Sequence, residues 1–246
     1  SFIKQQYDAG LRDLDEILRR IKAPKPNIMI VGGSGTGKTL SCETAAKALG
    51  LPYDEEDMTR FSETGYVGDS INEIPINMLK RADGNRYLAQ LGIILLDEID
   101  KLAGASGGGR DVSGKGVQNG MLKLVEGMQV PVDTNESSYL LSTQHMLFIA
   151  SGAFEGIDNV IYDRLGLRPE QSNGQWKSQI TTEDFIKYGM ERQLMGRFPT
   201  QVIYDDLGAQ DFVEIMQQSS TSPLQAYRND MALWGVDLKF HKDALY

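Results

Sequence analysis

The residues best suited to chemistry form a glycine-rich segment that ends in a lysine and a threonine. Gly32, Gly37, Lys38 and Thr39 have the spacing Gly-x-x-x-x-Gly-Lys-Thr, and a short apolar run, Ile28–Val31, precedes them. Glycines allow positive φ angles and let backbone N–H groups approach phosphate oxygens, and the start of a helix adds unpaired N–H groups. The full pattern, placed between a strand and a helix, predicts phosphate binding.

The residue types within this segment indicate a nucleoside triphosphate held together with magnesium. Lys38 supplies a point charge to the β- and γ-phosphates, and Thr39 supplies a hydroxyl to Mg²⁺. The residues expected to contact the nucleotide are those of the loop and the first helical turn: Gly33, Ser34, Gly35, Thr36, Gly37, Lys38, Thr39 and Leu40.

A second chemical signal is a pair of acids at the end of an apolar run. Ile93–Leu96 is followed directly by Asp97 and Glu98. In open α/β sheets ligands bind beyond the carboxyl ends of the strands, so these acids and the glycine loop should share one edge. Asp97 would hold Mg²⁺, directly or through water, and Glu98 would orient and polarise the attacking water. A carboxylate placed for water favours hydrolysis over transfer to a small molecule.

Three further segments contain candidates whose roles the residues alone leave open. The hydroxyl of Ser151, after the expected strand Met146–Ala150, could contact the γ-phosphate or the water, or could simply form a strand-end turn. Tyr66 and Val67, bracketed by glycines, could pack on the core, which the spacing favours, or form a mobile loop that exposes the aromatic ring. Arg197 could be an ordinary surface arginine at a turn before a strand.

The order of apolar runs and amphipathic segments predicts an α/β domain with a parallel sheet. Strands are expected at 28–31, 51–54, 93–96, 146–150, 201–204 and 236–240. Helices are expected at 8–22, 39–49, 115–126, 209–218 and 223–234, with two more beginning near Ser70 and Thr182. Residues 133–144 are polar and are expected to form a loop or a hairpin.

Composition limits the classes of protein that remain. The chain has 246 residues, of which 41% are hydrophobic and 24% charged, which is typical of a globular domain large enough for one sizeable core. A net charge of -9 argues against a dedicated nucleic-acid binder. Apolar runs are far shorter than a membrane span, and Cys42 with two distant histidines offers no disulfide framework or metal-ligand spacing. We expect a cytoplasmic protein with neither nucleic acid nor membrane as a partner.

Several longer segments resemble one known family. They follow one another in this order: GYVG at Gly65–Gly68, LLDEIDK at Leu95–Lys101, RDVSGKGVQ at Arg110–Gln118, the run Leu122–Gly127, FIASGAF at Phe148–Phe154 and GRFP at Gly196–Pro199. Together they resemble the ClpX/HslU class of AAA+ ATPases, which are ring-shaped protein unfoldases, and they are closer to ClpX. The resemblance extends from about residue 27 to residue 240.

The resemblance implies a fold and a set of cofactors. The fold would be the AAA+ P-loop NTPase domain, with three αβα layers, over residues 1–216. Residues 217–246 would begin a small helical lid domain that is cut short. The implied cofactors are ATP or ADP and Mg²⁺, and Arg197 would be an arginine finger that reaches the γ-phosphate of a neighbouring subunit.

The resemblance also implies two loops that touch substrate in the pore of the ring. Tyr66 and Val67 would form the first pore loop and grip the substrate. Arg110, Asp111 and Val112 would form the second pore loop, beside a glycine-rich stretch.

The implied activity is ATP hydrolysis by a homo-hexamer that moves polypeptide through its central pore. Delivery to a ClpP-like peptidase is a further option, although the Ile-Gly-Phe docking tripeptide of ClpX is matched only loosely by Leu165-Gly166-Leu167, which also suits the end of a helix. The alternative is a nucleotide-switched remodelling adaptor or assembly scaffold that does not thread its partners. A small-molecule kinase is a third possibility, disfavoured by the Asp97-Glu98 pair.

Overall fold

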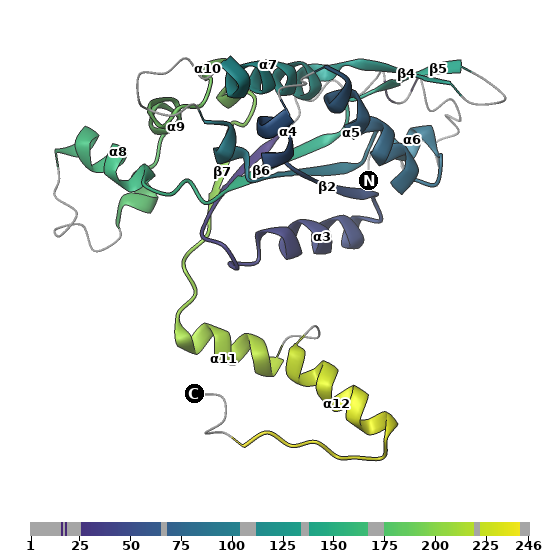
Figure 1. Ribbon diagram of the computed structural model, residues 1–246, viewed down its shortest axis with the longest axis vertical. Helices are drawn as coiled ribbons and strands as arrows, with labels where there is room; N and C mark the ends of the chain where they lie inside the picture. Colours follow the sequence, from purple (N-terminus) through teal and green to yellow (C-terminus); the bar gives the residue numbers. More distant parts are fainter. Residues whose placement is uncertain are drawn as a thin grey trace. The chain divides into compact units, whose positions relative to one another are not determined.

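A computed structural model shows how the chain folds (Figure 1). It describes residues 26–64, 68–103, 112–133, 138–166, 175–218 and 222–241, together with Glu16 and Leu18. The chain divides into two compact units, Ser1–Tyr204 and Asp205–Tyr246. Most of the helix expected at 8–22 lies outside the described residues, although Glu16 and Leu18 are both helical.

The first unit is built on a five-stranded sheet with the strand order β2-β3-β6-β1-β7. The strands are β1 Ile28–Val31, β2 Tyr53–Asp57, β3 Ile93–Asp97, β6 Leu147–Gly152 and β7 Thr200–Ile203. Every neighbouring pair in this sheet is parallel, so all the carboxyl ends lie at the same edge. The central strands β3, β6 and β1 are buried along nearly their whole length, as expected for a parallel sheet covered on both faces.

Helices cover both faces of this sheet, which confirms the three-layer α/β architecture (Figure 1). The described helices of the first unit are α3 Lys38–Leu49, α4 Thr59–Thr64, α5 Gly68–Arg81, α6 Arg86–Ala89, η1 Ile99–Leu102, α7 Val112–Gly127, α8 Ile157–Leu165, η3 Gln175–Gln179, α9 Thr182–Tyr188 and α10 Arg192–Met195. Helix α3 lies on one face of the sheet, and α4, α5 and α7 lie on the other.

The core follows the two-residue period of the strands. Leu95 packs with Cys42 and Ala46 of α3, whereas its neighbour Leu96 belongs to the larger cluster on the opposite face of the sheet. Burial raises the pKa of the Cys42 thiol to about 11, so this cysteine is a neutral core residue at physiological pH.

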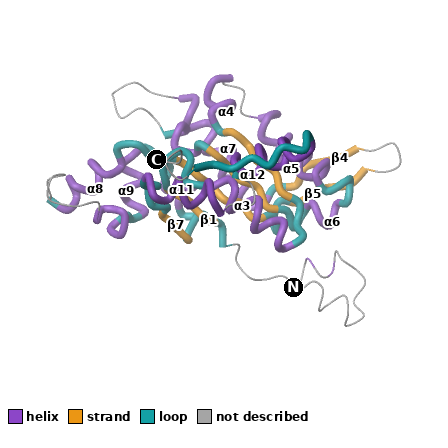
Figure 2. The backbone as a smooth tube through the Cα atoms, turned by 90° about the horizontal axis from the view of Figure 1, so that it is seen from below, coloured by secondary structure: helices purple, strands orange, loops and turns teal. Residues whose placement is uncertain are grey.

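One expectation about the strands is confirmed and another is wrong. The segment expected as a loop or a hairpin is a hairpin, with β4 Gln129–Asp133 antiparallel to β5 Ser138–Ser142, and it projects at one end of the first unit beside α5 and α6 (Figure 2). The strand predicted at 236–240 is wrong, because residues 236–241 have no regular secondary structure. Alternating apolar residues do not form a strand unless another strand pairs with their backbone groups.

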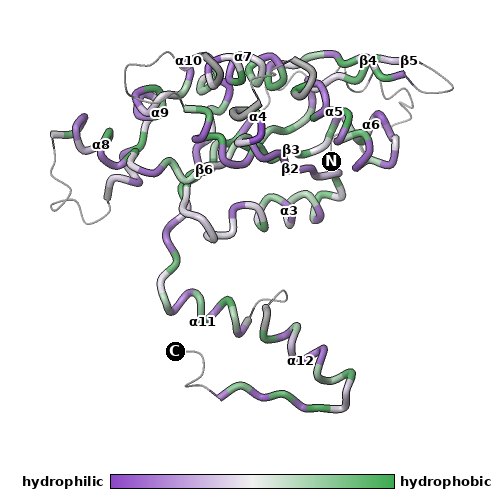
Figure 3. Tube along the Cα trace, in the orientation of Figure 1, coloured by the Kyte–Doolittle hydropathy of each residue, from purple (hydrophilic) through white to green (hydrophobic). Residues whose placement is uncertain are grey.

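The second unit contains helices α11 Ala209–Gln218 and α12 Pro223–Leu233. Ser222 caps α12, because its hydroxyl oxygen accepts from the N–H of Leu224 at 3.2 Å, and Pro223 occupies the first helical position. Hydrophobic and hydrophilic residues interleave along both helices (Figure 3). Large apolar side chains, among them Phe212 and Trp234, remain exposed. No helix among the described residues is both long enough and apolar enough to cross a membrane.

Candidate nucleotide-binding site

The glycine loop between β1 and α3 takes the backbone conformations that the sequence predicts. Gly35 and Gly37 have φ angles of 78° and 87°, in the left-handed region that glycine adopts most readily. Gly32 is needed for a different reason, since a Cβ atom at this position would lie 2.7 Å from Cβ of Tyr204. The loop therefore passes close to the segment after β7 before it turns into α3.

Hydrogen bonds from the side chains of Lys38 and Thr36 to backbone carbonyl groups stabilise the glycine loop. The ammonium group of Lys38 donates to the carbonyl oxygens of Gly32 and Gly33, both at 2.8 Å. The hydroxyl of Thr36 donates to the same Gly33 oxygen at 2.9 Å. These bonds place the lysine charge at the amino end of α3, where the helix dipole also favours an anion.

A cleft of about 420 Å³ opens at the carboxyl edge of the sheet. It is lined by the glycine loop, by the residues after β3 and by the turn after β6: Ser34, Gly35, Gly37, Lys38, Thr39, Leu40, Asp97, Glu98, Asp100, Lys101, Gly152, Ala153 and Glu155. The structure thus brings together the predicted phosphate loop, the predicted magnesium residues and Glu98. Gly33 and Thr36 do not line the cleft and belong to the internal bonding of the loop.

Asp97 is oriented by its neighbours. The hydroxyl of Ser151 donates to Oδ1 of Asp97, and the backbone N–H of Glu98 donates to the same oxygen at 3.0 Å. Ser151 is fully buried on β6 and does not line the cleft. Its side chain therefore orients Asp97. A contact of Ser151 with phosphate or water, one of the two roles that the sequence left open, stays a prediction.

Glu98 has an unusual backbone conformation. Its φ and ψ angles are 55° and 36°, a left-handed conformation that costs free energy for a residue with a Cβ atom. Such conformations cluster at functional sites. Glu98 is exposed and lines the same cleft as the glycine loop.

Asp100 is a member of the site that the sequence reasoning missed. It is only 5% exposed, and its Oδ2 accepts from the N–H of Phe154 at 3.3 Å. Its Oδ1 has no hydrogen-bond partner in the described part of the chain and faces Gly152, where a Cβ atom would lie 2.5 Å away. Asp100 thus links the turn after β3 to the turn after β6 through its hydrogen bond with Phe154. The sequence feature that could have identified Asp100 is the presence of an acidic residue two positions after Glu98.

The oxygen atoms around the cleft suit a hard cation. Thr39 offers a hydroxyl, and Asp97 and Asp100 offer carboxylates, which are the ligand types that Mg²⁺ prefers. Among the described residues there is no group of three or more His, Cys, Asp or Glu side chains that could hold a metal ion. Mg²⁺ is commonly bound by one or two carboxylates together with the phosphates of a nucleotide.

Arg197 lies at the opposite edge of the sheet. Ile28 pairs with Thr200 in the parallel register of β1 and β7, so Arg197 precedes the amino end of β7. The glycine loop leaves the carboxyl end of β1, and a strand of four residues spans about 13 Å. Arg197 does not line the cleft. Its Nε donates to Oε1 of Glu126 at 3.0 Å, and its Nη2 donates to the same oxygen.

The family model described as AAA domain (Cdc48 subfamily) matches residues 23–201. The chain belongs to this family. Among curated proteins it is similar to the ATP-dependent Clp protease ATP-binding subunit ClpX of Treponema denticola, with 32% identity over 242 residues, covering 90% of this chain and 58% of that protein. It is also similar to the protein of the same name from Azotobacter vinelandii, with 34% identity over 247 residues, covering 92% of this chain and 56% of that protein.

These similarities identify a ClpX-like AAA+ ATPase domain. The chain spans a little over half the length of the two relatives. The AAA domain match ends at residue 201, three residues before the end of the first compact unit. The assignment of residues 217–246 to a lid domain stays a prediction.

The two predicted pore loops fall largely outside the described part of this AAA domain. Tyr66, Val67, Arg110 and Asp111 lie outside the described residues. Val112 is the first residue of α7, and its side chain is not described. The substrate-gripping roles of these residues stay predictions.

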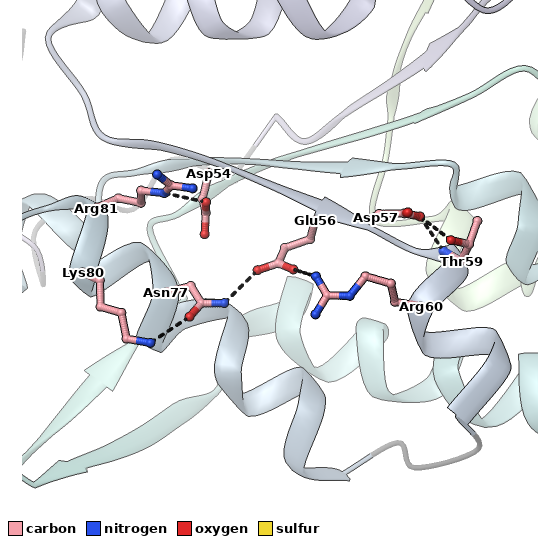
Figure 4. A network of polar contacts seen from close by, with 8 residues as sticks. All are labelled: Asp54, Glu56, Asp57, Thr59, Arg60, Asn77, Lys80 and Arg81. Atoms are coloured by element: carbon pink, nitrogen blue, oxygen red, sulfur yellow. Dashed lines mark hydrogen bonds and ion pairs between the residues drawn. The ribbon is translucent and has the colours of Figure 1, made fainter.

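A polar network supports the edge of the AAA domain beside the site (Figure 4). Asp54 and Glu56 of β2 are buried, and they accept from Arg81 at 2.9 Å and from Asn77 at 3.2 Å on α5. Burial raises the pKa of Glu56, while the hydrogen bond from Asn77 opposes this change. Strand β2 is thereby fastened to α5, and β2 in turn pairs with β3, the strand that ends in Asp97.

Proposed function

We propose that this protein hydrolyses ATP in a ring of six identical copies and uses the energy to move polypeptide through the central pore. The supporting observation is the division of the catalytic groups between the two edges of one sheet. The cleft contains the phosphate loop and Glu98, whereas Arg197 lies at the far edge, beyond reach of the same cleft. A nucleotide could meet both only where two copies adjoin.

Within one copy the cleft provides the groups for binding and for water activation. Lys38 and the N–H groups at the start of α3 would bind the β- and γ-phosphates. Thr39 and Asp97 would hold Mg²⁺, which supplies charge neutralisation at the phosphates when it is bound. Glu98, exposed in the cleft, would accept a proton from the attacking water and orient it.

The arginine of a neighbouring copy would complete the site. Charge develops on the γ-phosphoryl oxygens during transfer, and an arginine supplied in trans can contribute about 10³–10⁵ in rate. Arg197 suits this role because its side chain is 52% exposed and belongs to the turn before β7. The head-to-tail contact that this requires is the kind that closes into rings.

Peptidase delivery is a separate extension of this proposal. The names of the two relatives describe a subunit of a protease. The segment that loosely matches the docking tripeptide does not support it here, because Leu165 ends α8 and Gly166 is its left-handed C-cap, with φ 66°.

The first experiment measures ATPase rate against protein concentration, for the unchanged chain and for Arg197→Ala. The proposal requires specific activity to rise steeply with concentration and to collapse in the variant. A flat dependence would mean that one copy is sufficient and would overturn the ring. A stably folded model substrate then separates threading from scaffolding, since a nucleotide-switched adaptor would not unfold it under ATP. Release of inorganic phosphate from ATP in the absence of any small-molecule acceptor would exclude the kinase alternative.

A further inference from the structure

We infer that Glu126 is a positioning residue for Arg197 and that it prepares the guanidinium for the phosphate of a neighbouring copy. This inference rests on the proposed function, since it assumes that Arg197 acts in trans. Glu126 lies in the last turn of α7, and Arg197 lies in the turn between α10 and β7. The two residues are 71 positions apart in the sequence, and their side chains meet on the surface.

The backbone of Arg197 is fixed from the other side. Its carbonyl oxygen accepts from Nδ2 of Asn27 at 3.0 Å, and Oδ1 of Asn27 accepts from the N–H of Phe148 at 3.2 Å. Asn27 is only 3% exposed, so one buried amide joins the arginine turn to the ends of β1 and β6. The main chain of Arg197 therefore has a defined position relative to the sheet, and only its long side chain remains to be oriented.

The contact with Glu126 uses one edge of the guanidinium and leaves another edge available. Nε and Nη2 donate to a single carboxylate oxygen of Glu126. A guanidinium has five N–H donors in a rigid plane, so both hydrogens of Nη1 and the second hydrogen of Nη2 remain without a hydrogen-bond partner among the residues that the structure describes. These remaining donors form the end of the fork that binds phosphate oxygens in a bidentate manner. Glu126 can thus stay bound while Arg197 contacts a phosphate.

Glu126 is expected to reduce the conformational entropy that the side chain of Arg197 loses when it binds a phosphate. A free arginine side chain has many rotamers and loses them when it binds, whereas a side chain already held by a carboxylate loses fewer. Glu126 also keeps the cation from pairing elsewhere on its own copy. Removing its charge should therefore lower the rate of the chemical step and leave the binding of ATP to the cleft unchanged, because Glu126 does not line the cleft.

The chain offers a matched control. Arg192 and Glu183 form another exposed pair on the same unit, at 2.6 Å, with side chains that are 67% and 54% exposed. The Glu126–Arg197 pair has side chains that are 41% and 52% exposed. Glu183→Gln thus removes a comparable surface pair that has no proposed role in the site.

The test is a double-mutant cycle on the whole chain at a protein concentration where activity per copy no longer rises. Four variants are compared with the unchanged chain: Glu126→Gln, Arg197→Ala, the combination of both, and Glu183→Gln. We expect Glu126→Gln to lower kcat about tenfold with KM for ATP unchanged, and to have no further effect in the Arg197→Ala background. Glu183→Gln should leave both constants unchanged.

Three outcomes would overturn the inference. Glu126→Gln could leave kcat unchanged, it could lower kcat equally with and without Arg197, or it could raise kcat, which would make Glu126 a restraint on the arginine. The failure of the proposed function would look different, because Arg197→Ala alone would then retain full turnover. Unfolding curves of each variant identify any loss of kcat that comes from misfolding.

Discussion

The hydroxyl of Ser151 donates a hydrogen bond to Oδ1 of Asp97 from the neighbouring strand of the sheet. Ser151 is fully buried, whereas Asp97 is partly buried and lines the cleft, and Asp97 receives a second bond from the N–H of Glu98. One carboxylate oxygen is thus occupied by the protein, and the carboxylate has a fixed direction. We interpret Ser151 as a residue that orients the carboxylate of Asp97, which we propose would hold Mg²⁺ when a nucleotide binds in the cleft.

Ser151→Ala should weaken the dependence of nucleotide binding on Mg²⁺. The lost bond is to a charged group, for which the net contribution is about 1.5–3 kcal/mol, so the gain in affinity on adding Mg²⁺ should shrink about 10- to 100-fold. Binding of a fluorescent ADP analogue with and without Mg²⁺ measures this directly. Ser138→Ala is a control, because Ser138 donates to Asp133 at 2.7 Å on the exposed hairpin. Equal Mg²⁺ dependence in the Ser151 variant would contradict the interpretation.

Glu98→Gln should retain the binding of ATP and strongly lower the rate of ATP hydrolysis. The amide keeps the size of the side chain but cannot accept a proton from water, so the rate should fall about 10²–10⁴-fold. ATP affinity should be retained, because Lys38 and the glycine loop are unchanged. Phosphate release and equilibrium ATP binding are measured on the same preparation. Turnover close to that of the unchanged chain would remove Glu98 from its proposed role.

Gly32→Ala should destabilise the first unit and disturb the phosphate loop. The new Cβ atom would lie 2.7 Å from Cβ of Tyr204 and 3.2 Å from Oγ1 of Thr36, so the backbone must shift. Overpacking of this kind typically costs about 1–3 kcal/mol. Gly208→Ala serves as a comparison, since its Cβ atom would meet only Oδ2 of Asp211, at 3.5 Å. Urea unfolding midpoints that fall equally for both variants would show that the Tyr204 contact is unimportant.

The buried carboxylate of Asp184 should make stability depend on pH in acid. Burial alone raises its pKa, but hydrogen bonds from Arg164 and Thr181 outweigh this, so the pKa of Asp184 is held below its usual value. An acid with a lowered folded pKa stabilises the protein above its unfolded pKa of roughly 3.9 and loses that contribution as the pH falls through the folded value.

The comparison uses Asp184→Asn, which removes the titrating group. The unchanged chain should lose more unfolding free energy than the variant as the pH falls below about 4. Urea unfolding at a series of acid pH values measures the two slopes. Parallel slopes would mean that Asp184 titrates normally in the folded protein.

Much of the site could be predicted because local sequence determines it. The glycine pattern before Lys38 requires positive φ angles, which Gly35 and Gly37 have, and the apolar run before Asp97 predicts a buried strand that ends at the ligand edge. Once all the strands are parallel, these two segments must meet. The nucleotide cleft therefore followed from short-range patterns together with one rule of topology.

The contacts that the sequence did not reveal all join distant segments. Ser151 and Asp97 are 54 positions apart, and so are Asp100 and Phe154. No periodicity predicts which hydroxyl meets which carboxylate, because the strand order β2-β3-β6-β1-β7 decides it. The strand wrongly predicted at 236–240 illustrates the same limit, since a strand exists only with a partner.

The most direct test of a shared active site is to mix two inactive variants. Glu98→Gln keeps Arg197 but cannot activate water, and Arg197→Ala keeps Glu98 but lacks the arginine. If Arg197 acts on the neighbouring copy, mixed rings contain copies with an intact Glu98 beside an intact Arg197, and about a quarter of the sites in a random equal mixture should regain ATPase activity. If the mixture stays as inactive as its two components while both still assemble, Arg197 does not act between copies and the account is wrong.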